Sequence, residues 1–357
     1  MKLEDKTLRR IRNVLICYVI ICITPLCYRS RVLNGAHSSN GYAGGQIVCV
    51  IDLGDDMYSP HGLLTGFNYE LLQRFAKDNS CSIQIITTGQ DENYLDSLLA
   101  GKVDIVVTKD TVIATDKRIA TLHKVDDYSV WAMNRSQKSR VRVADNWIGH
   151  VRTTEDFLAL KNTYNTSFNP HKRAERGIRT QMVSPYDDLF RKYSEQLGWD
   201  WRMVAAVVYQ ESRFSISSRS SRGAQGLMQV MPQTGNYYGV DNLLDPEQNI
   251  MAGTSHLKRL QKLFGKEEIT REELIKFTLA AYNAGEGRIS DCRNLAAAKG
   301  LDSGKWEEVV KVIPMMREDA ILEEESVKLG KFLGHETIDY VESVLSHYEA
   351  ICQITSL

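Results

Sequence analysis

The segment ESRFSISSRSSRGAQGLMQVMPQTG, Glu211 to Gly235, joins the end of an apolar run to a loop rich in serine and glycine. The run before it, DWRMVAAVVYQESRF from residue 200 to 214, carries apolar residues around most of a helical surface, which predicts a central buried helix. Glu211 lies near the C-terminal end of that helix. Burial and the negative end of the helix dipole both raise the pKa of a carboxyl group. A carboxyl that keeps its proton at neutral pH can act as a general acid; the alternative is a solvated helix end.

The loop after Glu211 supplies a second indication of a site. Gly223 and Gly226 permit close backbone approach and unusual dihedral angles. The following LMQVMP segment places Met228, Gln229 and Met231 close together. Apolar side chains mixed with one amide are suited to the wall of a sugar-binding cleft, although the methionines could equally belong to the core.

The sequence from residue 184 to 357 predicts an all-α domain. Ser184 and Pro185 are expected as the N-cap and first residue of one helix, and Asp245 and Pro246 as those of another. Further helical patterns cover 270–285 and 335–351, and no strand-like alternation of any length occurs.

Residues 46–165 predict an α/β domain instead. Apolar runs at 46–52, 81–87, 103–108 and 128–134 have the character of strands, and helical patterns alternate with them. This order favours βαβ units and a largely parallel sheet. The stretch 166–183 is polar and basic without sustained periodicity, so we interpret it as a linker.

The N-terminus indicates export. Five basic residues precede an apolar run from Val14 to Tyr28, the order found in a signal segment, 1–28. A run of about 15 residues is short for a membrane span, which needs roughly 20. Residues 29–45 resemble a flexible tether. The chain is expected in the cell envelope, tethered to a membrane and facing the periplasm, with lipidation at Cys27, a retained anchor and a soluble periplasmic form left open.

Composition narrows the function. The 357 residues allow two or three domains, and a net charge of -1 offers no general attraction for nucleic acid. The seven cysteines form no CxxC pair and no Cys/His cluster with zinc spacing. No metal site is expected.

The motifs ESRF, GAQGLMQVMP, DP followed by N, and AAYNAG occur in order from Glu211 to Gly285 and resemble the soluble-lytic-transglycosylase domain, a goose-lysozyme-like α-helical fold. The tail, including KWEEVVKVIP and HETIDYVESVLSHYE, is similar to the membrane-bound lytic murein transglycosylase F subgroup. The resemblance covers roughly residues 184–351. It implies cleavage of the β-1,4 bond between N-acetylmuramic acid and N-acetylglucosamine in peptidoglycan, without a cofactor.

The same resemblance implies that Glu211 acts first as acid and then as base, giving a 1,6-anhydro product. It implies substrate-binding roles for Ser220, Met228, Gln229, Tyr282, Asn283, Glu336 and Tyr340. The Tyr282 hydroxyl is expected near Glu211, orienting it, and the element containing Glu336 and Tyr340 is expected to close the site. The alternatives are packing for the tyrosines and a helix C-cap for Asn283.

The α/β domain resembles the family 3 extracellular solute-binding domain through TGF at Thr65 to Phe67 and through Arg118, which matches an arginine that pairs with an amino-acid carboxylate. The chain has no room for the second lobe of that family, so we expect a single lobe. Arg118 is then a vestige in a surface ion pair, or one side of a shallow site for a peptide stem; a muropeptide or protein partner of the lobe stays open. The expected architecture is multidomain, a periplasmic solute-binding type lobe followed by a lysozyme-like helical domain.

Two other functions remain possible from sequence. One is a hydrolytic muramidase on the same fold. The other is a cell-wall sensing or binding protein without turnover.

Overall fold

The computed structural model describes residues 41–53, 63–87, 94–109, 116–165, 168–265, 269–324 and 326–355. The predicted signal segment 1–28 and the tether up to residue 40 lie outside the described residues. The described chain forms two compact units. None of its helices combines the length and the apolar character needed to cross a bilayer.

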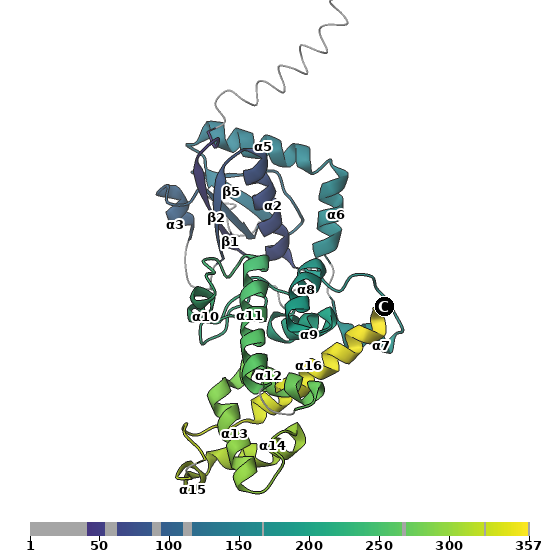
Figure 1. The fold of residues 1–357 in the computed structure, drawn as a ribbon. Coiled ribbons are helices and arrows are strands. Elements are labelled where there is room, and N and C mark those ends of the chain that lie inside the picture. The colour runs from purple at the N-terminus through teal and green to yellow at the C-terminus, as the bar shows by residue number, and fades with distance from the viewer. Residues whose placement is uncertain are drawn as a thin grey trace, which may run out of the picture. The chain divides into compact units, whose positions relative to one another are not determined.

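A five-stranded sheet forms the centre of the α/β part, in the order β2-β1-β3-β5-β4 (Figure 1). The strands are β1 (Gln46–Asp52), β2 (Ser82–Thr87), β3 (Ile105–Lys109), β4 (Ile119–Thr121) and β5 (Ser129–Asn134). The four predicted strands are therefore present, and the three-residue β4 was missed.

The prediction of a largely parallel sheet is wrong for the half of the sheet around β5. This strand pairs antiparallel with β3, Val107 lying opposite Trp131, and antiparallel with β4, Ala120 lying opposite Met133. The seven residues between β4 and β5 are too few for the crossover that a parallel connection requires, so the chain turns back directly.

Aromatic packing holds the helices of the first unit on the sheet. Trp131 on β5 is fully buried and lies 5.9 Å, between ring centroids, from Phe75 on α2 (Leu64–Asp78). Trp147 on α5 (Lys138–Val151) stacks on Trp131 at 6.0 Å and donates a hydrogen bond to Asp78. Helix α5, which the sequence analysis did not predict, therefore completes this aromatic core. The short α3 (Tyr94–Leu99) buries Leu98.

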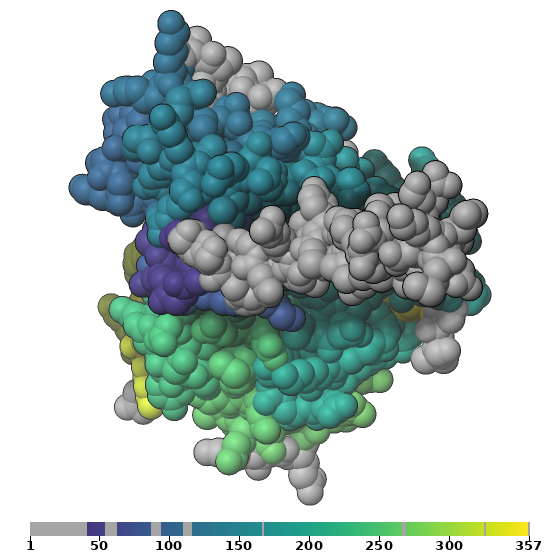
Figure 2. All heavy atoms as spheres, turned by 90° about the horizontal axis from the view of Figure 1, so that it is seen from above, coloured from purple at the N-terminus to yellow at the C-terminus, as the bar shows by residue number. Residues whose placement is uncertain are grey.

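The second unit is helical. Its helices are α6 (Glu155–Tyr164), α7 (Pro170–Glu175), α8 (Asp187–Ser194), α9 (Trp201–Ser212), α10 (Pro232–Tyr237), α11 (Pro246–Phe264), α12 (Arg271–Ala284), α13 (Glu286–Ala298), α14 (Trp306–Val312), α15 (Asp319–Leu322) and α16 (His335–Ile354), with 3-10 turns at Glu195–Leu197 and Ile313–Arg317. The prediction of an all-α second half is confirmed for the described residues. Teal and green atoms of this unit lie next to one another on the face shown in the all-atom view (Figure 2).

Helix α9 is the centre of the helical unit, as its sequence predicts. Every residue from Met203 to Tyr209 is buried, and α8 and α16 pack against it. Asp200 caps the helix by accepting a hydrogen bond from the Arg202 amide. An apolar helix surrounded on several sides gives its last turn, which contains Glu211, a rigid and partly desolvated setting.

Two of the predicted helix starts have different outcomes. Asp245 caps α11 by accepting a hydrogen bond from the Gln248 amide at 2.8 Å, with Pro246 as the first helical residue, as expected. Ser184 was expected to cap the next helix, but α8 begins only at Asp187. The Asp187 carboxylate accepts hydrogen bonds from both the amide and the hydroxyl of Ser184, which holds the chain in a turn ahead of the helix.

The predicted linker 166–183 also differs from expectation. It contains α7, which packs on α16, and Thr180 forms a short parallel bridge with Thr355. Asn169 caps α7 and Pro170 begins it. A helix of six residues is too short to give a periodic sequence pattern, which is why the stretch resembled a linker. Residues 50–53, 63–70 and 154–165, predicted in the α/β domain, group with the helical unit.

Candidate active site

Glu211 lies in the last turn of α9. The helix ends because Arg213 and Phe214 adopt left-handed backbone conformations, with φ of 50° and 68°. This reversal buries Phe214 and turns the chain into the loop that follows. The side chain of Glu211 stays partly exposed, so it remains accessible to a substrate.

Tyr340 on α16 is the hydrogen-bonding partner of Glu211. Its hydroxyl donates to Glu211 Oε1 at 2.6 Å, and its side chain is buried. Burial raises the pKa of Glu211 to about 7, and the hydrogen bond from Tyr340 opposes this rise. The carboxyl therefore holds its proton over a large fraction of molecules at neutral pH, as a general acid requires.

Tyr282 was expected to have its hydroxyl near Glu211, orienting the acid. In the structure this hydroxyl donates a hydrogen bond to the carbonyl oxygen of Met228 at 2.8 Å. Burial raises the pKa of the Tyr282 hydroxyl, and the negative charge of Glu211 adds to this rise. Tyr282 is therefore near enough to Glu211 to be affected by its charge. Tyr282 thus supports the loop backbone at Met228, and Tyr340 contacts the Glu211 carboxyl itself.

The loop between α9 and α10 is held by one buried amide. Asn249 on α11 accepts a hydrogen bond from the Met228 amide and donates to the carbonyl oxygens of Gln225 and Leu243, at 2.8 to 2.9 Å. Gly226 has a φ of 76°, and a Cβ there would lie 2.3 Å from the Asn249 amide nitrogen. Only glycine permits this conformation and this close approach.

Met228 and Gln229 were expected on a cleft wall; Met228 is buried in the structure, whereas Gln229 is partly exposed. Met228 is fully buried and its side chain contacts Gly253 of α11. The Gln229 amide donates to two carbonyl oxygens, those of Ser218 and Gly226, each at 3.0 Å. Both side chains therefore help to hold the loop in its conformation. Met231 is 40% exposed and is the methionine that reaches the surface.

Ser220 is exposed, and its hydroxyl accepts a hydrogen bond from the Ala224 amide at 3.0 Å. Glu336 is exposed in the first turn of α16, one turn before Tyr340. Both lie at the surface of the helical unit.

Asn283 links two helices. Its Oδ1 accepts a hydrogen bond from the hydroxyl of Thr337 at 2.8 Å, joining α12 to α16. Helix α12 continues to Ala284 and is capped by Gly285, so Asn283 is not its C-cap. Thr337 is buried three residues before Tyr340. Sequence reasoning missed Thr337, although the Thr-x-x-Tyr spacing places both side chains on one helix face.

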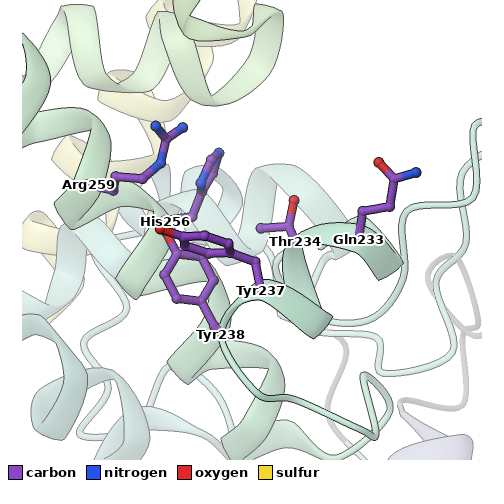
Figure 3. Close-up of a pocket in the computed structure, with 6 residues that line it drawn as sticks. All are labelled: Gln233, Thr234, Tyr237, Tyr238, His256 and Arg259. Atoms are coloured by element: carbon purple, nitrogen blue, oxygen red, sulfur yellow. The ribbon is translucent and has the colours of Figure 1, made fainter.

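A pocket between α10 and α11 was also missed (Figure 3). It is lined by Gln233, Thr234, Tyr237, Tyr238, His256 and Arg259. The ring of His256 connects this pocket to the surroundings of Glu211, because its centroid lies 5.6 Å from the centroid of the Tyr282 ring. His256 and Arg259 are three residues apart on α11, so they lie on one face of that helix, and this spacing could have indicated the pocket from sequence.

Arg118 belongs to the other unit and makes an exposed ion pair. Its guanidinium contacts Asp116 at 2.7 Å, with 72% of the arginine side chain and 31% of the aspartate side chain exposed. The hydrogen bonds from Arg118 lower the pKa of Asp116 to about 2. This geometry fits the expected surface ion pair.

Residues 188–302 match the family model described as the Transglycosylase SLT domain. The match begins in α8 and ends just beyond α13, so it includes Glu211, the glycine loop and Tyr282. The matched residues therefore lie within the helical unit and are similar to an SLT domain.

Curated relatives extend the likeness beyond that domain. The chain is similar to proteins named membrane-bound lytic murein transglycosylase F. The one from Desulfosudis oleivorans is 29% identical, over 73% of this chain and 59% of the relative. The relative from Shewanella frigidimarina is 36% identical, over 48% of this chain and 35% of the relative. The relative from Pseudomonas fluorescens is 30% identical, over 68% of this chain and 46% of the relative. The chain thus spans about a third to three fifths of the length of these relatives.

Among solved structures, an inactive mutant of lytic transglycosylase Slt from Pseudomonas aeruginosa is 24% identical, with a TM-score of 0.31 over 47% of this chain and 24% of that one. The 70 kDa soluble lytic transglycosylase from Escherichia coli is 21% identical, with a TM-score of 0.31 over 66% and 38%.

Proposed function

We propose that this protein is a peptidoglycan lytic transglycosylase that uses Glu211 as its one catalytic carboxyl group. The observation that carries the proposal is the position of Glu211 at the end of a buried helix, with a pKa of about 7 and a hydrogen bond from Tyr340. The SLT match over residues 188–302 and the similarity to membrane-bound lytic murein transglycosylase F support the choice of substrate.

In the first step, the protonated Glu211 gives its proton to the oxygen that links N-acetylmuramic acid to the next sugar. The bond between that oxygen and the anomeric carbon breaks, and the leaving sugar departs with the proton. The anomeric carbon becomes electron-deficient, and the N-acetyl group of the same sugar stabilises it. Glu211 is now a carboxylate and can act as a base.

In the second step, Glu211 takes the proton from the 6-hydroxyl of the muramic acid, whose oxygen bonds to the anomeric carbon. The product is a 1,6-anhydro ring, no water is consumed, and Glu211 is protonated again. Hydrolytic glycosidases use two carboxyl groups within about 10 Å of each other. The proposed route uses Glu211 alone, and burial raises the pKa of this carboxyl group so that it can hold the transferred proton.

Tyr340 has the positioning role in this mechanism. Its hydrogen bond occupies Oε1 and leaves Oε2 of Glu211 to carry the transferred proton. The bond from Thr337 to Asn283 fixes α16 against α12 and so fixes the position of Tyr340. Ser220 and Glu336, both exposed, are proposed to contact the glycan.

The proposed setting is the cell envelope, with peptidoglycan strands as the partner and the N-terminal segment as the membrane attachment. The sequence of residues 1–28 supports this, as does the likeness to relatives whose name describes them as membrane-bound. The five-stranded sheet is proposed as a reduced solute-binding lobe, with Arg118 as a vestige of its ligand site.

Mass spectrometry of digested sacculi tests the function. The proposal expects muropeptides with 1,6-anhydro ends, each one water lighter than the hydrolysed form. Products with reducing ends would instead identify a hydrolytic muramidase. An intact, glycan-binding protein that releases nothing would identify a binding protein.

A further inference from the structure

Two histidine side chains contact each other next to the helix that carries Glu211. His171 Nε2 lies 2.7 Å from His347 Nδ1, and Nε2 of His347 lies 2.9 Å from Oε1 of Gln210. These three side chains come from α7, α16 and α9, and both α7 and α9 pack against α16 (Figure 1). All three are partly buried, and none has a role in the mechanism above.

The partners of His347 determine which of its nitrogens carries the proton. An amide oxygen only accepts, so Nε2 of His347 donates to Gln210. In a neutral ring the other nitrogen, Nδ1, is then an acceptor, and Nε2 of His171 donates to it. Both nitrogens of His347 are therefore hydrogen-bonded, which fixes the orientation of its ring between the two partners.

His347 holds the two residues that precede the acid. Its ring packs edge-on against the ring of Tyr209, with 4.9 Å between centroids, and Gln210 is the residue directly before Glu211. Tyr340, which contacts Glu211, is seven residues before His347 and so lies on the same face of α16. Two hydrogen bonds therefore join α16 to consecutive residues in the last turn of α9.

A movement of this turn would alter both hydrogen bonds together. We propose that His171 and His347 form a proton-sensitive clasp that positions Glu211: the clasp keeps the last turn of α9 where Tyr340 reaches the carboxyl group, and it opens when both imidazole rings are protonated. The inference rests on the proposed function for the catalytic role of Glu211. His347 acts through α9, so it is a positioning residue and not a catalytic one.

The clasp tolerates one added proton and not two. With one, either ring still donates across the contact while the other accepts. With two, an N–H group and a positive charge on each ring would face each other across 2.7 Å. Burial lowers the pKa of His347 to about 4, and the charges of His171 and Arg213 add to this effect. The contact is therefore kept at neutral pH and lost near pH 4.

The surroundings of His347 contain no counter-charge for a second proton. From α7 it faces His171, and from the end of α9 it faces Arg213, which is positive. The ring of Tyr209 also faces it, and burial raises the pKa of that phenol, so it stays neutral. Helix α12 packs against α16 as well, but no carboxylate in the described part of the chain is among the groups that act on the pKa of His347.

The variant His347→Phe tests the positioning role, because it removes both hydrogen bonds and keeps a ring against Tyr209. We expect kcat on a soluble glycan to fall about five- to tenfold, the effect of one hydrogen bond, with KM within twofold. The pKa of Glu211, followed by NMR of its carboxyl carbon, should rise, since the hydrogen bond from Tyr340 lowers this pKa and would be held less firmly.

Tyr348→Phe is the matched control. It removes another hydrogen bond between α16 and α9, from the residue next to His347, but its partner Asp200 is the N-cap at the opposite end of α9. Both kcat and the pKa of Glu211 should stay as in the parent protein. Should His347→Phe fail to fold, His171→Leu, which removes only the outer partner, is expected to change both quantities in the same direction.

The variant His171→Gln tests the proton dependence. A glutamine amide can donate to His347 or accept from it, and it does not titrate. The rate of the parent protein should have an acid limb with a midpoint near pH 4, and this limb should be absent in His171→Gln. His150→Gln, which removes an exposed imidazole from α5, should keep the limb of the parent.

An unchanged pKa of Glu211 in the folded His347→Phe protein would overturn the positioning role. An acid limb that is the same in His171→Gln, or that coincides with unfolding of the parent in circular dichroism, would overturn the proton dependence. Failure of the proposed function has a different signature: the parent protein would release no anhydro products, while the NMR pKa of Glu211 would still respond to His347→Phe.

Discussion

The hydroxyl of Tyr340 donates a 2.6 Å hydrogen bond to Oε1 of Glu211, across 129 positions of sequence. The bond joins the last turn of α9 to the second turn of α16, and these two helices pack against each other. It gives the acid a fixed orientation, while burial gives it a raised pKa.

Tyr340→Phe should lower the rate of sacculus digestion at neutral pH by about tenfold to a hundredfold, the effect of losing a hydrogen bond to a charged group. The bond lowers the pKa of Glu211, so its removal should move the alkaline limb of the pH-rate profile to higher pH. Tyr348→Phe, which removes a hydrogen bond from the same helix to Asp200, should not move that limb. An unchanged limb in Tyr340→Phe would contradict the assigned contact.

Glu211 should make folding stability depend on pH. Its pKa is about 7 in the folded protein and 4.5 as the ordinary value, so the folded state keeps the proton between these values while the unfolded state loses it. The free energy of unfolding therefore falls as pH rises from about 4.5 to 7, by up to about 3 kcal/mol. Denaturant titrations should show Glu211→Gln more stable than the parent at pH 8 and similar to it at pH 4. A constant difference across this range would mean that the carboxyl is not desolvated.

Thr337→Val should reduce turnover while leaving substrate affinity nearly unchanged, because the hydrogen bond to Asn283 positions α16 and does not contact the glycan. Thr337→Ser keeps the hydroxyl and should restore most of the rate. The measurement is kcat and KM on a soluble glycan. A change confined to KM would argue against a positioning role.

Gly226→Ala and Gly223→Ala form a matched pair in the loop. Both glycines have positive φ, but an added Cβ meets the Asn249 amide and the Leu243 carbonyl only at Gly226. Gly223→Ala should cost about 1 kcal/mol through backbone strain, and Gly226→Ala about 1–3 kcal/mol more through overpacking. Urea unfolding measures both, and equal losses would show that the close approach at Gly226 does not matter.

The sequence predicted the parts of this molecule that local patterns control. The apolar run from Met203 to Tyr209 predicted the buried helix and the setting of Glu211, and Asp245 with Pro246 predicted the start of α11. The short elements α7 and β4 were not predicted, because three to six residues are too few to show a periodic pattern of apolar residues.

The detailed geometry of the site depended on distant contacts. Nothing near Tyr282 indicates that its hydroxyl binds the Met228 carbonyl, and nothing near Tyr340 indicates that it reaches Glu211. Met228 was expected on a cleft wall, but it is buried. Its burial depends on Gly253 of α11, which leaves room for the methionine side chain and is distant in sequence. Such pairings follow from how helices cross, which a single sequence does not specify.

The most direct test of the central claim is the pKa of Glu211 itself. The side-chain carboxyl carbon can be followed by NMR from about pH 4 to pH 9 in protein labelled on glutamate, with Glu211→Gln identifying the signal. The account predicts a midpoint near 7. A midpoint close to 4.5, the ordinary value of an exposed glutamate, would contradict it.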